Sequence, residues 1–359
     1  MSRIFDYYFD KDENNSVAVL PDFFLDILVD PNFSYKEFQE KMDKTFHRGG
    51  GNILGSSFNF LPGGNGGNVA LVTNQLGMET YFIGETSGLG FELINYFYRS
   101  KGIKIFFNTL GELSASFILE FKNKSGKTNI MVSSSKSLRN YGPKKLSDNQ
   151  INVIKQSGFV CITNFQNSKL LDLINYIFEI TDKNQIVSID FSDLSPHKSR
   201  IKEIYELFTN NKDREFIVTG NENEIAMLAS LLPNSTNKEI QNTDLDHILL
   251  SLSKTFRNIA FCLHSADFSS TAISGKLLSK VKTLSLPTIK RATGAGDSWH
   301  GGLITAISLS NCNQLGIITK NQWKEIIQFA NYVAGYWVSI GSPGSISEIK
   351  EWIETISGV

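Results

Sequence analysis

The stretch "RATGAGDSWHGG", from Arg291 to Gly302, places two glycines around an alanine and follows them with one carboxylate and an apolar run of helical spacing. One interpretation is that Asp297 caps a helix, since an aspartate oxygen accepts from backbone N–H groups that the first turn leaves unpaired. The other is that residues 294–296 present those N–H groups to an anion, with Asp297 beside it. The rest of the chain has to decide between a capping role and a binding role.

Composition excludes several classes of protein. The chain has 359 residues, of which 41% are hydrophobic, and this is ample for the core of one large or two medium domains. Its formal net charge of −1 gives no reason to expect nucleic acid or an anionic membrane as a partner, so an anionic ligand must be held locally. Cys161, Cys262 and Cys312 are far apart and odd in number, which indicates ordinary thiols in a reducing compartment and no structural zinc site.

Targeting and membrane signals are not found in the sequence. The first residues, "MSRIFDYYFDKDENNS", are crossed by charges and lack the apolar core of a signal peptide. No run approaches the ~18 consecutive apolar residues that indicate a membrane span. We therefore expect a cytoplasmic protein with no membrane partner.

The order of apolar segments predicts an α/β fold. The segment from Ser16 to Val29 reads as a buried strand broken at Pro21, and the helix that follows residue 68 is expected to end at Gly77. Strands then alternate with helices, which indicates a mostly parallel central sheet with helices on both faces. We expect a single domain over residues 1–359.

A small β lid is expected beside this sheet. The segment from Ser114 to Val132 resembles two strands joined at Ser125 and Gly126. Together with the polar and glycine-rich excursion before the "GGNGGN" stretch, it predicts a lid built from parts of residues 30–62 and 105–135.

Polar or glycine-rich clusters follow four of the expected strands, where open parallel sheets bind ligands. They are Asp22 with Asp26, "GGNGGN" at 63–68, "GNENE" at 220–224 and "TGAGD" at 293–297. Together with the closing "FANYVAGYWVSIGSPGS", these stretches resemble the ribokinase-like (PfkB) family of carbohydrate and nucleoside kinases, over roughly residues 17–350. The resemblance implies a ribokinase-like fold and an enzyme that uses ATP and Mg²⁺ to phosphorylate a hydroxyl of a sugar or nucleoside.

The resemblance also implies roles for particular residues. Asp297 would be the general base, and Gly294, Ala295 and Gly296 the anion hole, because glycine allows backbone N–H groups to approach phosphoryl oxygens closely. Glu224 would hold Mg²⁺, mostly through water. The resemblance assigns the acceptor to Asp26, Gly63, Gly64 and Asn68, and the nucleotide to Asn221 and Asn331. His264 replaces a glycine of the family's nucleotide loop, and its role stays open between a contact with the nucleotide and a structural or solvated residue. Asp22 stays open between a capping and a functional role.

Two departures from the family pattern affect the cofactors. Arg291 and Ala292 replace an acid and a threonine, and that acid is among the ligands of a monovalent cation in many relatives. A guanidinium has donors only and cannot coordinate K⁺, so we expect an enzyme that is insensitive to K⁺. The stretch "CLHSAD", from Cys262 to Asp267, lacks both glycines of a nucleotide loop, so its contacts with adenine and ribose are not fixed by the resemblance.

Two other functions stay open. A kinase of an already phosphorylated sugar would need basic side chains near the acceptor, for which His47 and Arg48 are the candidates. A catalytically silent sugar- or nucleotide-binding regulator is favoured by the altered loop, but the presence of Asp297 and Glu224 argues against it. A homodimer through the lid is a further expectation, and the sequence does not name the acceptor.

Overall fold

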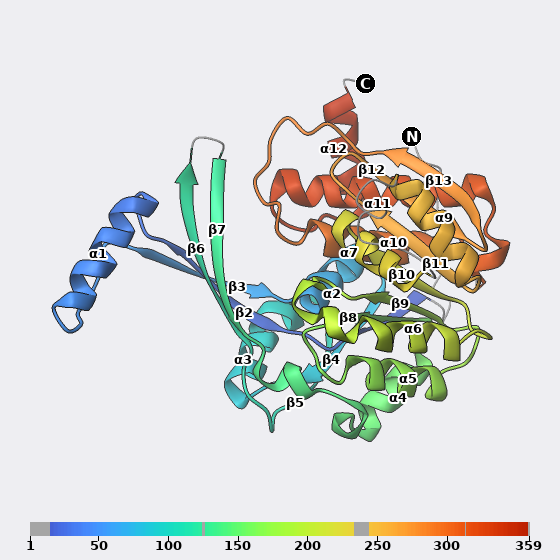
Figure 1. The fold of residues 1–359 in the computed structure, drawn as a ribbon, viewed down its shortest axis with the longest axis horizontal. Helices are drawn as coiled ribbons and strands as arrows, with labels where there is room; N and C mark the ends of the chain where they lie inside the picture. Colours follow the sequence, from blue (N-terminus) through green and yellow to red (C-terminus); the bar gives the residue numbers. More distant parts are fainter. Residues whose placement is uncertain (1–14, 124–125, 233–243, 313, 358–359) are drawn as a thin grey trace.

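The computed structural model describes residues 15–123, 126–232, 244–312 and 314–357, which form two sheets (Figure 1). Within these residues the large sheet has nine strands. Their order is β13 (Lys276–Lys282), β12 (Phe268–Ile273), β11 (Ile259–His264), β10 (Phe216–Gly220), β9 (Ile186–Asp190), β8 (Phe159–Thr163), β1 (Ser16–Leu20), β4 (Glu79–Glu85) and β5 (Lys104–Asn108). Only the β11–β12 and β12–β13 pairs are antiparallel, so the predicted mostly parallel sheet is confirmed.

Helices cover both faces of this sheet. Along β1, Val17 and Val19 pack on one face, while Ala18 and Leu20 pack on the other. The first face carries α2 (Asn65–Gln75), α3 (Gly88–Tyr98), α10 (Ala295–Leu309), α11 (Lys320–Ile340) and α12 (Ile346–Ser357). The second carries α4 (Asp148–Gln156), α5 (Leu170–Ile180), α6 (Ile201–Asn210), α7 (Glu222–Leu228) and α9 (Leu245–Thr255). Because both faces are buried, central strands read as unbroken apolar runs.

Short 3₁₀ helices complete the connections. They are η3 (Arg99–Lys101), η4 (Lys136–Asn140), η5 (Pro143–Lys145), η6 (Ser195–Arg200), η7 (Ala229–Leu231) and η8 (Leu315–Ile317). None of the described helices has both the length and the apolar character that crossing a bilayer requires.

The small sheet is a lid that projects from one side of the molecule (Figure 1). Its strand order is β3 (Ser57–Gly63), β2 (Phe24–Asp30), β6 (Ala115–Asn123) and β7 (Gly126–Ser134). The expected boundaries need correction, because β2 lies in the lid and β5 pairs with β4 in the large sheet. Both strands are apolar, and an apolar run predicts burial without saying which sheet buries it. The turn was expected at Ser125 and Gly126, of which Gly126 begins β7. Residues 124–125 and 1–14 lie outside the described residues.

The lid also carries a helix that the sequence analysis did not predict. Helix α1 (Tyr35–His47) begins with a capping box, in which Ser34 and Glu37 bond to each other's backbone N–H groups. Its residues Tyr35 and Phe38 pack on Phe121 of β6, with ring centroids 5.4 and 5.6 Å away. This contact places α1 over one face of the lid sheet, at the outer end of the lid (Figure 1).

Candidate active site

Gly294 is the N-cap residue directly before helix α10, and its φ of 86° is in the left-handed region that favours glycine. A Cβ at this position would lie 2.8 Å from the indole of Trp337, so the close packing also requires glycine. Asp297 is the third residue of the helix, and no described side chain caps the helix start. The capping interpretation of Asp297 is therefore wrong. The Ala295 N–H donates to the carbonyl of Ala292 at 3.1 Å, whereas the N–H groups of Gly296 and Asp297 have no partner among the described residues and stay open to an anion.

The Asp297 carboxylate is held by two amides from helix α2. Asn65 donates to its Oδ1 at 2.7 Å, and Asn68 donates to its Oδ2 at 2.8 Å. Burial raises the pKa of Asp297 to about 7, although both amide hydrogen bonds act to lower it. A carboxylate that titrates near neutral pH is suited to accept a proton in catalysis. Asn65 was missed in the sequence analysis, although it lies inside the "GGNGGN" stretch.

Asp22 has a different task. Its fully buried carboxylate accepts from the backbone N–H groups of Asn65 and Gly66, both at 2.8 Å, and also bonds to Asn164 and Thr163. It therefore closes the N-terminus of α2, the helix that carries both amide partners of Asp297. The capping role of Asp22 is thus confirmed, for a helix and not for a strand end.

Asp26 lies where the lid meets the body of the protein. Burial raises the pKa of Asp26 to about 6, against the lowering effects of Ser116 and Arg291. A Cβ added to Gly63, on the neighbouring strand β3, would overlap this carboxylate. Gly64 starts α2 with a φ of 89°. Asp26, Gly63, Gly64 and Asn68 thus lie around the start of α2, next to Asp297.

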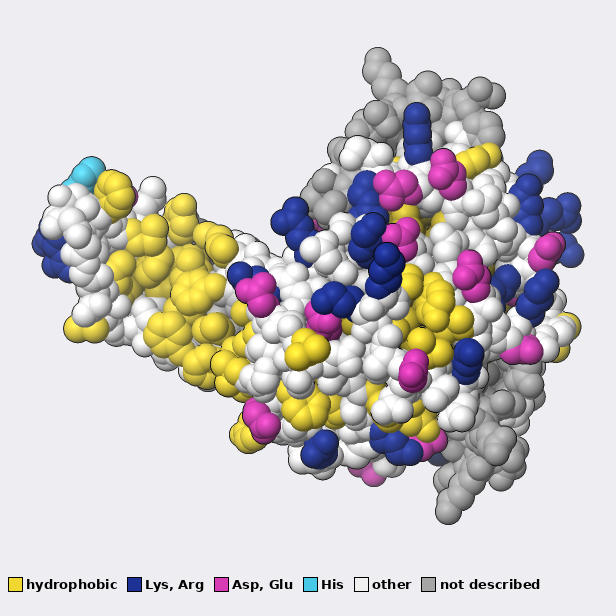
Figure 2. All heavy atoms as spheres, turned by 90° about the horizontal axis from the view of Figure 1, so that it is seen from below, with side chains coloured by type: hydrophobic (Ala, Val, Ile, Leu, Met, Phe, Trp, Pro, Cys, Tyr) yellow, Lys and Arg dark blue, Asp and Glu magenta, His cyan; other side chains and the backbone are white. Residues whose placement is uncertain are grey.

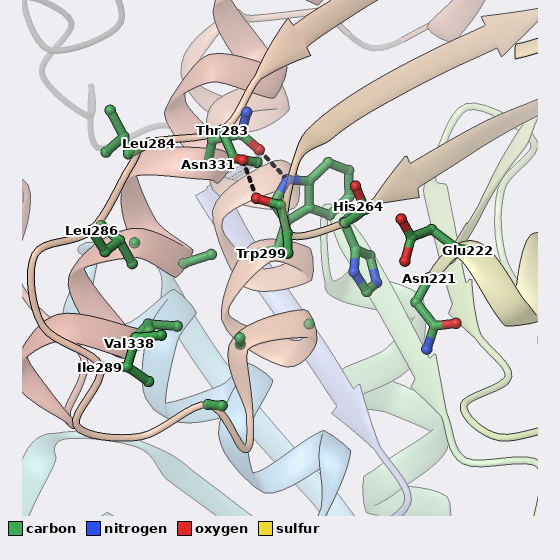
Figure 3. A pocket seen from close by; sticks show the side chains of 17 residues that line it. Asn221, Glu222, His264, Thr283, Leu284, Leu286, Ile289, Trp299, Asn331 and Val338 are labelled. Atoms are coloured by element: carbon green, nitrogen blue, oxygen red, sulfur yellow. Dashed lines mark hydrogen bonds between the residues drawn. The ribbon is translucent and has the colours of Figure 1, made fainter. Parts of the chain in front are cut away.

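A pocket of about 590 Å³ opens on the other side of the α10 N-terminus (Figure 3). Its walls are mainly apolar, and they include Leu284, Leu286, Ile289 and Val338. Ala295 and Gly296 form the wall that it shares with α10. Its size and apolar character are those of a typical small-molecule site.

The polar side chains of this pocket include all three residues that the sequence analysis assigned to a nucleotide or left open as a contact with one. Asn331 accepts from Ser269 and Trp299 through its Oδ1, while its buried Nδ2 has no hydrogen-bond partner among the described residues. The His264 ring lies 5.3 Å from that of Trp299, and burial lowers its pKa to about 4, so the imidazole is neutral. Asn221 lies across the pocket from Asn331 (Figure 3).

Glu224 lies in the first turn of α7, close enough to Asp190 for the two carboxylate charges to interact. Glu224 and Asn221 make a capping box, with the Asn221 N–H donating to Oε2 of Glu224 at 2.8 Å. Burial first, and the charge of Asp190 second, raise the pKa of Glu224 well above its usual range. The described residues contain no cluster of three or more His, Cys, Asp or Glu side chains that could hold a metal. One or two carboxylates fit Mg²⁺, which keeps several of its waters and is bound by carboxylates together with substrate phosphates.

His47 and Arg48 do not lie at the acceptor side. His47 ends α1 and Arg48 follows it, both exposed, at the outer end of the lid (Figure 1). Their closeness in sequence to the glycine-rich stretch was misleading because α1 carries them away from it. The basic residue that the structure places near Asp26 and Asp297 is Arg291.

Residues 33–351 match the model of the pfkB family of carbohydrate kinases, and the chain belongs to this family. No curated protein sequence matches the chain closely enough to count as a relative. Solved structures of kinases share its fold. Ribokinase from Arabidopsis thaliana, complexed with ribose and ATP, is 16% identical, with a TM-score of 0.65 over 94% of this chain and 97% of that one.

Two further structures have the same architecture. Fructokinase from Xylella fastidiosa, with bound ATP, is 12% identical over 96% of this chain and 99% of that one, with a TM-score of 0.69. Adenosine kinase from Sinorhizobium meliloti is 17% identical over 94% and 99%, with a TM-score of 0.68. The ribokinase-like fold expected from the sequence is therefore confirmed.

Proposed function

We propose that the protein is an ATP-dependent kinase that transfers the γ-phosphoryl group to a hydroxyl of a small sugar or nucleoside. One observation carries the proposal: the N-terminus of α10 borders the apolar pocket through Ala295 and Gly296, and its Asp297 bonds to the start of α2, beside which Asp26 lies against Gly63. A phosphoryl group held there has a nucleotide site on one side and an acceptor site on the other. Phosphoryl transfer depends mainly on such positioning and on charge stabilisation.

Each part of the site has a defined task in this proposal. Asp297 accepts the proton of the attacking hydroxyl, and the amides of Asn65 and Asn68 hold its carboxylate in place. The N–H groups around Gly294, Ala295 and Gly296 stabilise the charge on the transferring phosphoryl oxygens. Asp26 accepts from hydroxyls of the acceptor, and the missing side chain of Gly63 leaves room for its carboxylate.

The nucleotide occupies the pocket of Figure 3. Its apolar walls suit a flat base, and the unpartnered Nδ2 of Asn331 offers a donor to a ring nitrogen. The neutral imidazole of His264 packs against Gly296 and offers a polar contact where a glycine-rich loop was expected. The bound ATP reported in two of the similar structures supports ATP as the donor.

Release of ADP is the direct test. The purified protein is incubated with ATP, Mg²⁺ and a panel of sugars, nucleosides and their carboxylate and phosphate derivatives, in both K⁺ and Na⁺ buffers of equal ionic strength. Turnover with at least one acceptor is expected. Measurable binding of a nucleotide or sugar without any turnover would contradict the proposal and favour the regulator. The cytoplasmic location stays a prediction.

We also propose that the enzyme needs no monovalent cation. Position 291 has a guanidinium in place of a carboxylate that could bind the cation. The guanidinium charge repels a cation, because two like unit charges ~4 Å apart repel by about 4 kcal/mol at an effective dielectric near 20. The backbone N–H of Arg291 donates to the carbonyl of Val338 at 3.2 Å, which helps to hold the turn without an ion. Equal rates in K⁺ and Na⁺ are expected, and a tenfold K⁺ activation would contradict this.

Glu224→Gln should raise the Mg²⁺ concentration needed for half-maximal rate and lower kcat, because an amide is a poorer partner for a hard cation and its waters. Glutamine can still accept from the Asn221 N–H, so the start of α7 is retained. A titration of Mg²⁺ at saturating acceptor measures the effect. Glu206→Gln, on the exposed side of α6, is the matched control. An unchanged Mg²⁺ dependence would leave Glu224 as an ordinary capping residue.

The lid exposes an apolar face that we propose joins two copies of the chain. Phe60 and Phe117 both pair with Ile27, and Val132 pairs with Phe117, so these side chains share one face. Phe60 and Val132 are 58% and 65% exposed, and hydrophobic side chains gather over the lid in Figure 2. Large exposed apolar patches mark interaction surfaces. The same face on a second copy, related by twofold symmetry, would cover it.

Phe60→Glu should convert this dimer to a monomer, since a carboxylate on each copy would be buried at the centre of the interface. Light scattering after size-exclusion chromatography measures the mass. Asn59→Glu adds the same charge on the opposite face of β3 and should keep the dimer. A wild-type protein that is monomeric at tens of micromolar would contradict the proposal.

A further inference from the structure

Arg291 is held in an unusual position beside the candidate site. Its guanidinium lies 4.7 Å above the ring of Trp337, and its backbone N–H donates to Val338. Trp337 is itself fixed, because its indole N–H donates to the carbonyl of Thr293 at 2.9 Å. Stacking on a buried, anchored indole limits the motion of the guanidinium plane.

The charge of Arg291 acts on both acids of the site but pairs with neither. Asp26 and Asp297 are, in this order, the carboxylates whose charges act on it most strongly. Among the described residues, no carboxylate forms an ion pair with the guanidinium and no acceptor bonds to it. The pKa of Asp26 stays raised, whereas a direct ion pair would lower it. Arg291 is therefore not the salt-bridge partner of Asp26.

A half-buried guanidinium without hydrogen-bond acceptors lowers the stability of the fold, unless a bound ligand supplies the acceptors. The side chain of Arg291 is only partly exposed, and this burial lowers its pKa. Its planar fork of N–H donors matches the paired oxygens of a carboxylate or a phosphate. The missing partner is thus an anionic group.

We propose that Arg291 selects an acceptor that carries an anionic group, a carboxylate or a phosphate, besides the hydroxyl that is phosphorylated. The proposal rests on the proposed kinase function and names its substrate class. Arg291 does not line the pocket assigned to the nucleotide, and Asp26 is the acid it acts on most. We therefore assign the anion to the acceptor, on the side of Asp26, and the matched acceptor pairs test this assignment. Without Arg291, the carboxylates of Asp26 and Asp297 would repel such an acceptor.

Matched pairs of acceptors test the proposal. D-Gluconate is compared with D-glucose, and D-fructose 6-phosphate with D-fructose, so that carboxylate and phosphate are separated. For each pair the ratio of kcat/KM, anionic over neutral, is measured for the wild type and for Arg291→Gln. Binding of the same four probes with ADP present is measured by calorimetry, as a readout besides turnover.

The wild type should prefer the anionic member of at least one pair, and Arg291→Gln should lower that ratio about 10- to 150-fold, the worth of one charge-assisted contact. Arg291→Lys should lower the ratio less, because lysine keeps the positive charge and loses only the paired N–H donors of the guanidinium. Lys290→Gln removes a neighbouring exposed charge and should leave the ratio unchanged.

Three results would overturn the inference. If the wild type turns over or binds only the neutral member of each pair, the inference about Arg291 is wrong, but the proposed kinase function is retained. An unchanged ratio in Arg291→Gln would also overturn the inference, since the preference would then have another origin. If the protein neither binds nor turns over any of the four probes, and turns over no acceptor of the wider panel, both the inference and the proposed kinase function are contradicted.

Discussion

Replacing Asp297 by asparagine is expected to lower kcat by about 10²- to 10⁴-fold, the usual contribution of a general base. The amide is nearly isosteric with the carboxylate but cannot take the proton of the hydroxyl. Asp297 does not cap α10, so the helix start is not affected. ADP release measures kcat, and calorimetry measures the dissociation constants of nucleotide and acceptor, which should change little. A variant that keeps more than about a tenth of kcat would contradict the role of Asp297 as base.

The pH dependence gives an independent check of the same residue. Since burial raises the pKa of Asp297 to about 7, the carboxylate is protonated and inactive below this pH and becomes a base above it. The kcat/KM of the wild type should therefore rise with pH through about 7. The residual activity of Asp297→Asn should lack this acid limb. An identical limb in both proteins would assign the titration to another group.

The architecture of the body could be predicted from the sequence because its pattern is strong. A parallel sheet covered on both faces needs apolar strands separated by helices, and the strands from β8 to β11 are of this kind. The lid was harder. Strand β2 follows β1 after only a few residues and is equally apolar, so the pattern could not show that the chain changes sheets. Helix α1 was missed, although Ser34 and Glu37 have the spacing of a capping box.

The candidate site, too, could be predicted only in part from the sequence. The motif residues lie at the starts of α2, α7 and α10 and on strand β2, and their roles stay proposals. The partners of these residues could not be predicted, because the contacts are long-range. Asn65 and Asp297 are 232 positions apart, and only folding brings the amide to the carboxylate. The position of Arg291 depends in the same way on Trp337, which lies 46 positions further along the chain, on helix α11.

Gly63→Ala should lower kcat/KM for the acceptor by about 100-fold, mainly through a higher KM. The added Cβ would overlap the carboxylate of Asp26, which must rotate away and release its hydrogen bonds to the acceptor. Two charge-assisted hydrogen bonds of about 1.5 kcal/mol each account for a loss of this size. The φ of Gly63 is not positive, so alanine adds no backbone strain and the fold should survive. Steady-state kinetics measures the effect, and circular dichroism checks the fold.

Two comparisons separate this cause from a general loss of stability. Gly88→Ala is the matched control, because a Cβ there meets nothing within 4 Å, and its kinetics should equal those of the wild type. In an Asp26→Ala background the clash no longer exists, so Gly63→Ala should add almost nothing to the loss already caused by removing the carboxylate. Such strong non-additivity is the signature of two residues that act through one contact. Losses that simply add would show that Gly63 acts on the acceptor without Asp26, and the assignment of that carboxylate to the acceptor would then fail.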